Sequence, residues 1–190
     1  MEEQNILDIR TRNEFRQWLE THHTTEKACW VCVKRGRPTD DDTFWYIDAV
    51  EEALCFGWID STIRHIDPLH RAQHFTPRNP KSTYSRPNIE RLIWLDGRGL
   101  IHPKVRPSLE HLITTDYVFP GDILKAVRQD PAAWEHYVSF SEPYKRIRIA
   151  YIDAARKRPD EFAKRLENFI RKTRENKLIV GYGGIDKYYR

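Results

Sequence analysis

Two short polar segments contain the side chains best suited to holding a charged or polar molecule. The first, residues 51–61 (EEALCFGWIDS), places Asp60 and Ser61 directly after two large aromatic residues that flank Gly57. The second, residues 75–88 (FTPRNPKSTYSRPN), contains three prolines, three cations, four Ser or Thr hydroxyls and one Tyr hydroxyl, but no carboxylate. Proline fixes φ and removes a backbone donor, so this segment is expected to be a stiff loop whose cations and hydroxyls stay available for binding.

Together the two segments predict a ligand-binding site at one end of a β-hairpin. In this interpretation Arg78 and Lys81 supply charge, the hydroxyls supply directional hydrogen bonds, and Trp58 with Tyr84 form an apolar wall. The expected partner is a small anionic or polar ligand. The alternative is a rigid connector, in which Arg78 or Lys81 pairs with Asp60 and a serine caps the next helix. The predicted ligand-binding residues are Trp58, Asp60, Ser61, Arg78, Lys81, Ser82, Tyr84, Ser85 and Asn88.

The Cys29-Trp-Val-Cys32 spacing could serve redox chemistry or a structural metal. A redox cysteine needs a helix N-terminus to lower its pKa, whereas these residues fall in an expected strand that points them to opposite faces. A zinc site would need two more ligands, and the nearest histidines, His22 and His23, precede the strand at a helix end. Two small buried residues are therefore the favoured interpretation.

Three histidines, His65, His70 and His74, surround the predicted hairpin, and two carboxylates, Glu51 and Glu52, are adjacent. A metal site on His70 and His74 is geometrically conceivable because they share a strand face, but no further ligand completes it. Adjacent glutamates point apart on a helix, which does not suit an acid–base pair. No phosphate-binding loop, nucleophile elbow or zinc-protease motif is present. We therefore expect no catalytic residues, no metal and no cofactor, and the sequence favours a non-enzymatic protein.

Hydrophobic patterns predict the elements that would position these residues. Apolar residues at helical spacing predict helices over 11–22 and 47–56, the second ended by Gly57, and another from about Ser85 to Gly97. Short apolar or period-two runs predict three strands. The expected strands cover residues 28–33, 58–66 and 70–76. The predicted fold class is α+β: a small, mainly antiparallel sheet covered by helices and followed by a helical C-terminal module.

The chain changes character near residue 117. Beyond it the β-type runs stop, and N-cap residues before proline, as in Asp130-Pro131, open a series of helices. The expected domains are a mixed α/β domain over 1–117, a helical module over 118–177 and a flexible tail over 178–190.

Composition and charge set further limits. The chain of 190 residues is 39% hydrophobic and 12% aromatic, which is too apolar for a disordered protein. The chain has three cysteines, no apolar leader and no apolar run of membrane-spanning length, so we expect a cytoplasmic protein with no membrane span. The sequence does not predict the oligomeric state. Residues 118–190 hold 16 Lys and Arg against 10 Asp and Glu, so an anionic partner is conceivable there.

The polar segments also carry a resemblance to a known family. EEALCFGWIDS and HFTPRNPKSTYSRPNIERL resemble the paired signature of the YdeI/OmpD-associated, or bacteriocin-protection, proteins. The helices from Pro120 to about Lys177 resemble the helical module of that family, so the resemblance covers roughly residues 45–177. Tyr84 stands where the family has tryptophan, and Pro87 where it has a helix former. The resemblance brings no catalytic residue or cofactor and implies a role in surviving bacteriocins or antimicrobial peptides.

The resulting hypothesis is a non-enzymatic stress-protection protein that binds a small anionic or polar ligand. One alternative is a nucleic-acid-binding protein that uses its basic C-terminal half, although no recognised nucleic-acid-binding motif is present. Another is an unrecognised hydrolase that uses Asp60 or a histidine.

Overall fold

The computed structural model describes residues 6–40, 42–66, 71–181 and 184–189. The chain divides into two compact units. The N-terminal unit comprises Met1–Tyr84 and Arg91–Ile113, and the C-terminal unit comprises Ser85–Glu90 and Thr114–Arg190. The division falls within helix α3 (Arg86–Asp96), and helix α4 (Arg106–Thr114) follows it in the chain.

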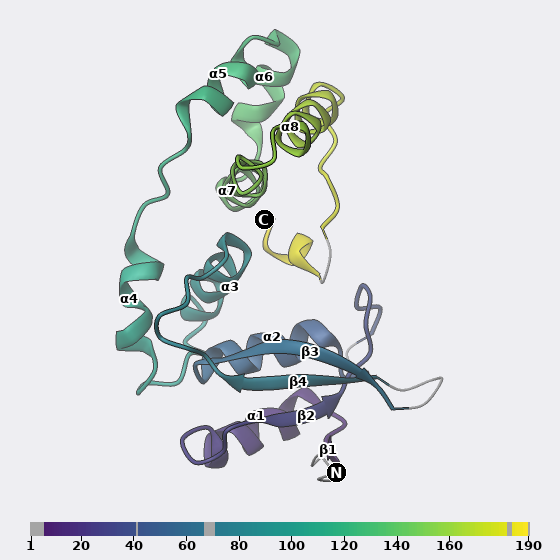
Figure 1. Cartoon of the computed structure of the whole chain (residues 1–190), viewed down its shortest axis with the longest axis vertical. Coiled ribbons are helices and arrows are strands. Elements are labelled where there is room, and N and C mark those ends of the chain that lie inside the picture. Colours follow the sequence, from purple (N-terminus) through teal and green to yellow (C-terminus); the bar gives the residue numbers. More distant parts are fainter. Residues whose placement is uncertain (1–5, 41, 67–70, 182–183, 190) are drawn as a thin grey trace. The chain divides into compact units, whose positions relative to one another are not determined.

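The N-terminal unit contains a four-stranded sheet in the order β1-β2-β4-β3 (Figure 1). Its strands are β1 (Ile6–Leu7), β2 (Cys29–Cys32), β3 (Trp58–His65) and β4 (Arg71–Pro77). Only β1 and β2 are parallel, so the predicted α+β class with a mainly antiparallel sheet is confirmed. The two-residue strand β1 was not predicted. His70, the expected start of the returning strand, lies outside the described residues.

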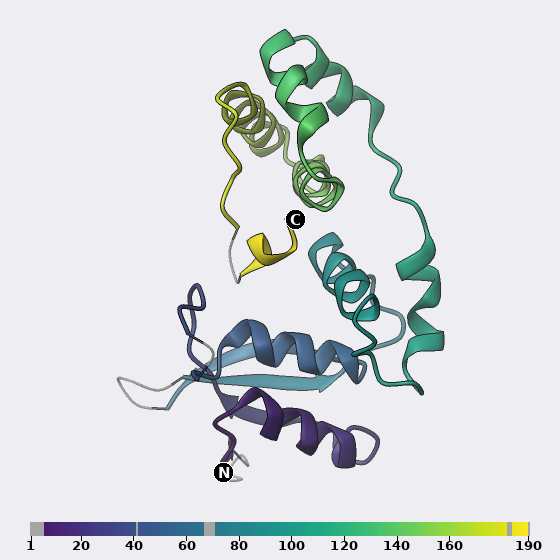
Figure 2. The same cartoon turned by 180° about the vertical axis from the view of Figure 1, so that it is seen from behind.

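Helices α1 (Arg12–His22) and α2 (Tyr46–Cys55) pack against the same face of this sheet (Figures 1 and 2). The Phe15 ring of α1 lies 5.3 Å from Phe75 of β4, and Tyr46 of α2 bonds to Asp60, the register partner of Phe75. Burial of this apolar helix face provides most of the stabilisation of such a short helix. Gly57, with φ of +73°, then turns the chain from α2 into β3.

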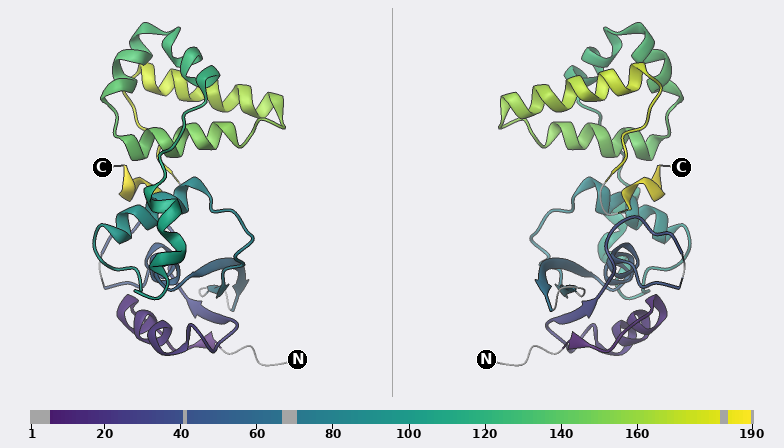
Figure 3. Two further views of the ribbon diagram at one scale, coloured as in Figure 1. Left: turned by 90° about the vertical axis from the view of Figure 1, so that its left-hand side faces the viewer. Right: turned by 90° about the vertical axis from the view of Figure 1, so that its right-hand side faces the viewer.

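The C-terminal unit is helical (Figure 3). Its helices are α5 (Gly121–Arg128), α6 (Pro131–Ser139), α7 (Glu142–Asp153) and α8 (Pro159–Arg174). Two of them begin as the sequence indicates: Asp130 accepts a hydrogen bond from the Ala133 N–H, and Ser141 accepts one from the Tyr144 N–H. Ile123, Ile149 and Phe169 are among the residues buried here.

The C-terminal segment, predicted to be a flexible tail, contains a 3-10 helix, η1 (Ile185–Tyr188). Tyr189 is buried at 6% exposure and packs edge-on against the Tyr144 ring at 4.8 Å. The Ser141 hydroxyl also donates a hydrogen bond to the Tyr189 carbonyl at 2.5 Å. The aromatic side chains of the segment therefore anchor it to α7, which its glycines and its terminal position do not indicate.

Across the described ranges, the helices are too short or too polar to span a lipid bilayer.

A buried charge network joins α1 to α2. Glu51 and Glu52 have 0% and 2% exposure, and both reach Arg12, at 2.7 Å and 2.6 Å respectively. Arg16 adds a 2.7 Å contact to Glu52 and donates to the Leu100 carbonyl at 2.9 Å. The expectation that the adjacent glutamates point apart is corrected, because one guanidinium spans both carboxylates. Although burial lowers the pKa of Arg12, the Glu52 and Glu51 carboxylates outweigh that effect and raise it.

Breaking this network should destabilise the N-terminal unit strongly. Arg12→Ala removes the cation that contacts both buried carboxylates, Glu51 and Glu52, and loss of one partner in a buried pair typically costs about 3–5 kcal/mol. We expect urea denaturation, followed by circular dichroism, to show a drop of this order. Arg10→Ala is the control, because Arg10 and its partner Asp8 are 83% and 86% exposed, and such pairs contribute less than about 1 kcal/mol. Equal effects of the two substitutions would contradict the structural role of the network.

Candidate functional site

The loop between β4 and α3 is organised by one of its own cations. The Arg78 guanidinium lies 3.7 Å over the Tyr84 ring, and its Nη2 donates to the carbonyls of Ser82 and Thr83. The Arg78 N–H also donates to the Gly57 carbonyl at 2.9 Å, which ties the two signature segments together. Arg78 therefore holds the shape of the loop through its ring contact, Nη2 and backbone N–H, while its Nε is buried without a hydrogen-bond partner among the described residues.

The three predicted residues at the start of β3 are divided between the two faces of the sheet. Trp58 is buried at 1% exposure and donates from Nε1 to the His23 carbonyl at 3.1 Å. Asp60 lies on the helix-covered face and accepts a hydrogen bond from the Tyr46 hydroxyl at 2.6 Å. Ser61 is exposed on the opposite face, 2.8 Å from Nδ1 of His74. The alternation of a strand thus separates side chains that are adjacent in sequence.

The remaining predicted residues are spread over both units. Lys81, Ser82 and Tyr84 belong to the N-terminal unit, where the first two are exposed. Ser85 and Asn88 belong to the C-terminal unit. The structure therefore brings together Arg78, Ser82 and Tyr84 but not the full set, and the binding role of the nine residues stays a prediction.

A polar chain around Asp60 was not predicted. Arg35 stacks on the Tyr46 ring at 4.1 Å and donates to the Gln73 side-chain oxygen at 2.8 Å. Burial, reinforced by the Asp60 carboxylate, raises the pKa of Tyr46 to about 12, so its hydroxyl remains a hydrogen-bond donor at neutral pH. Asp60 is thus engaged within the N-terminal unit, by partners that no local sequence pattern connects.

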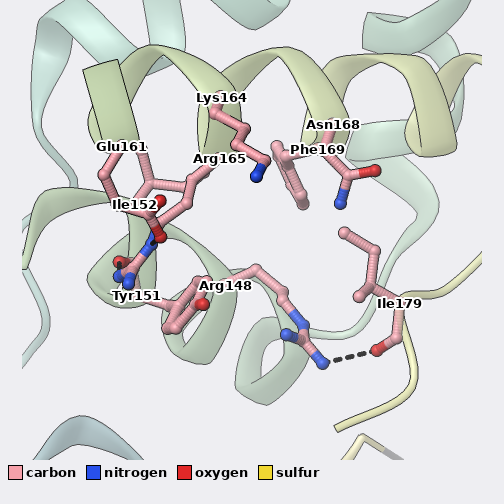
Figure 4. Close-up of a pocket in the computed structure, with 9 residues that line it drawn as sticks. All are labelled: Arg148, Tyr151, Ile152, Glu161, Lys164, Arg165, Asn168, Phe169 and Ile179. Atoms are coloured by element: carbon pink, nitrogen blue, oxygen red, sulfur yellow. Dashed lines mark hydrogen bonds and ion pairs between the residues drawn. The ribbon is translucent and has the colours of Figure 1, made fainter. Parts of the chain in front are cut away.

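A cavity of about 270 Å³ lies in the C-terminal unit, between α7, α8 and the segment after α8 (Figure 4). It combines cationic, polar and apolar walls. The lining residues are Arg148, Tyr151, Ile152, Glu161, Lys164, Arg165, Asn168, Phe169 and Ile179.

Arg148 is the most unusual of these residues because it is a buried cation with no carboxylate partner among the described residues. Its side chain is only 9% exposed, and Nη2 donates to the Ile179 carbonyl and the Tyr189 hydroxyl. Nε is buried without a hydrogen-bond partner in the part of the chain that the structure describes. Burial raises the pKa of Tyr189 to about 12, so this neighbour stays neutral and does not offset the charge.

The other polar groups of the cavity divide into paired and available ones. Arg165 is paired, since it contacts Glu161 at 2.7 Å, donates to the Tyr151 carbonyl and lies 3.7 Å over the Tyr151 ring. Lys164 and the amide nitrogen of Asn168 point from α8 toward the cavity (Figure 4). The Asn168 oxygen accepts a hydrogen bond from Arg171 at 2.7 Å, which fixes this orientation of the amide. The cavity therefore offers donors and positive charge to an incoming group.

This cavity was missed from the sequence, although one signal was available. Arg148 lies four residues after Tyr144 and four before Ile152, so it falls on the apolar face of α7. A cation in that position must be buried or distort the helix packing. Acidic residues at the same spacing would have indicated a simple ion pair, but position 144 is tyrosine and position 152 is isoleucine.

Several other arginines of the C-terminal unit are paired with carboxylates. Arg156 makes two hydrogen bonds to Asp122, at 2.8 and 2.9 Å, and Arg174 pairs with Asp130. This pairing removes part of the charge that nucleic-acid binding would need. In the portion of the chain that is described, no three His, Cys, Asp or Glu side chains are grouped to hold a metal ion.

The fold and the cavity define a two-unit α+β protein with a helical, cation-lined module. Residues 7–108, more than half of the chain, match the family described as Domain of unknown function (DUF8412), and the chain belongs to that family. Residues 116–176 match the Bacteriocin-protection, YdeI or OmpD-Associated family, which confirms the predicted resemblance over this part of the chain. Both signature segments lie within the first match, and eight of the nine cavity residues lie within the second. No curated protein and no solved structure matches the chain.

Removing the Arg78 side chain should loosen the loop around it. Arg78→Ala eliminates the contact with Tyr84 and the bonds to two carbonyls, and a cation–π contact alone contributes about 0.5–1 kcal/mol at an exposed site. We expect the amides of residues 79 and 81–84 to exchange with deuterium about tenfold faster. Lys81→Ala is the control, since the exposed Lys81 is held through its backbone N–H. A loop unaffected by Arg78→Ala would contradict the organising role.

Proposed function

We propose that this protein is a non-enzymatic, cytoplasmic protein of stress protection that acts by binding a small anionic ligand in the cavity between α7 and α8. The match to the bacteriocin-protection family supports the protective role. The observation that carries the ligand-binding role is Arg148, a buried cation that lines the cavity and has no carboxylate partner among the described residues.

Burial of a charge without compensation is costly, and an anionic ligand would supply the missing opposite charge. Lys164 adds a second cation on α8, and Arg165 with Glu161 forms a neutral wall. The nine lining residues include a single carboxylate, Glu161, which is already in an ion pair, and no cysteine, serine or histidine. This composition favours binding over general acid–base or nucleophilic catalysis.

Loss of the Lys164 charge should weaken anion binding. We expect Lys164→Ala to reduce affinity about tenfold, because a hydrogen bond to a charged group contributes about 1.5–3 kcal/mol. The measurement is amide chemical-shift titration with inorganic phosphate, benzoate and phenyl phosphate at low salt. Benzamide, which is neutral, should leave the residues of the cavity unshifted.

Lys125→Ala is the matched control, because Lys125 is exposed on α5 and does not line the cavity. This variant should bind like the unsubstituted protein. Absence of shifts at Lys164, Asn168 and Ile179 with all three anions would refute the proposed function.

A hydrolase is the second candidate, favoured by the contact between Ser61 and His74. Asp60 pairs with Phe75 and Ile63 with Gln73, so Ser61 and Thr62 both lie opposite His74 in a β-bulge. The bulge brings the Ser61 hydroxyl to 2.8 Å from His74 Nδ1, and Trp30 packs on the imidazole at 4.5 Å. Burial lowers the pKa of His74, which favours the neutral form that a general base requires.

The hydrolase candidate predicts turnover of 4-nitrophenyl acetate. Ser61 would attack the ester carbonyl carbon while His74 takes its proton, 4-nitrophenolate would leave, and water would then hydrolyse the acetyl group from Ser61. The rate should rise with pH through the lowered pKa of His74 and disappear in Ser61→Ala, whereas Thr62→Ala should retain it. An unchanged rate in Ser61→Ala removes this candidate.

A further inference from the structure

The hydrogen-bonding groups of the cavity specify the head of its ligand. Arg148 and Lys164 face the cavity from α7 and α8, and the Asn168 amide nitrogen points in beside them (Figure 4). Nη1 of Arg148 and Nζ of Lys164 have no hydrogen-bond partner within the described ranges. A ligand that satisfies these donors must bring several acceptor oxygens and negative charge. A carboxylate or a phosphate meets both requirements.

The apolar residues of the cavity specify the rest of the ligand. Phe169 and Ile152 are buried at 1% and 2% exposure, and Ile179 completes the apolar lining from the segment after α8. An inorganic anion would leave the partly exposed Ile179 side chain in contact with water. An apolar group placed against it would gain about 25 cal/mol for each Å² removed from water.

The size of the cavity limits the apolar part. Its volume of about 270 Å³ is small for a ligand pocket, since drug-sized ligands occupy clefts of about 300–1,000 Å³. One ring or one branched aliphatic group fits this space together with an acidic head.

We infer, on the basis of the proposed function, that the ligand is a small amphipathic acid: a carboxylate or phosphate monoester carried on one compact apolar group. The acidic head binds Arg148, Lys164 and the Asn168 amide. The apolar group packs on Phe169, Ile152 and Ile179. Ile179 is supplied by the segment that also brings Tyr189 to Arg148, so that segment contributes both to the apolar wall and to the position of the cation.

Two pairs of probes separate the head from the apolar group. Isothermal titration calorimetry on the full chain compares benzoate with acetate, and phenyl phosphate with inorganic phosphate. We expect each aromatic member to bind about tenfold more tightly than its partner, because burial of a ring contributes about 1.5–3 kcal/mol. The tighter of benzoate and phenyl phosphate identifies the head group, and either order supports the inference.

A matched pair of substitutions tests the apolar wall. Ile179→Ser should weaken benzoate and phenyl phosphate about fivefold, through lost apolar contact, and leave acetate and inorganic phosphate unchanged. Val180→Ser is the control, because Val180 is 69% exposed and does not line the cavity. Ile179 and Val180 both follow α8 in the chain, so neither substitution replaces a residue of that helix.

The outcomes distinguish this inference from the function on which it rests. Equal affinity within each pair, or aromatic binding that Ile179→Ser does not weaken, overturns the amphipathic ligand and leaves anion binding intact. If none of the four anions binds, the proposed function fails together with the inference. Binding of benzamide as tightly as benzoate would also overturn the inference, because the head would then need no charge.

Discussion

The N-terminal unit depends on the need to neutralise two carboxylates inside it. Glu51 and Glu52 are buried in the middle of α2, and an unpaired charge in that position would be too costly for the helix to stay packed. Arg12 and Arg16 of α1 provide the compensation, so the two helices are fixed against each other. This arrangement in turn holds Phe15 and Leu19 in the core, both at 0% exposure. The turn at Gly57 then leads α2 directly into β3, whose first residue, Trp58, enters the same core.

Features set by neighbours in sequence could be predicted, and features set by distant partners could not. The helices over 11–22 and 47–56 follow from the spacing of apolar residues, and the caps at Asp130 and Ser141 follow from residues three positions away. The network of Glu51 and Glu52 joins residues 39 and 40 positions apart, which no local pattern records. The short strand β1 has only two residues and depends on β2 for its pairing. The C-terminal segment is anchored by Tyr189 to α7, which is 48 positions away at Ser141.

The local sequence also did not show which of the predicted ligand-binding residues lie close together in space. Polar residues close in sequence were expected to converge, but strand alternation sends Asp60 to the helix-covered face and Ser61 to the other. In the loop, Arg78 contacts the Tyr84 ring and donates to a backbone carbonyl of its own segment, so it stabilises the loop. Composition alone does not show whether such a cation stabilises a loop or binds a ligand. Proximity along the chain was thus a poor guide to proximity of functional groups. Position on a helix face, which was not used, would have been the better guide, since it places Arg148 among apolar neighbours.

Stability alone does not explain an arginine at that place. Replacement of a buried charged group by an apolar side chain of similar volume is often neutral or stabilising, so α7 would lose little by carrying leucine or methionine at position 148. The surrounding groups nevertheless accommodate the cation: Tyr144 and Tyr189 flank the guanidinium at 5.9 and 5.4 Å, and the Ile179 carbonyl accepts from it. These neutral partners orient the charge without cancelling it, which preserves its attraction for an anion. A ligand that completes the compensation stabilises the folded unit by its binding free energy. Binding of the proposed ligand would therefore link occupancy of the cavity to the stability of α7, α8 and the segment after them.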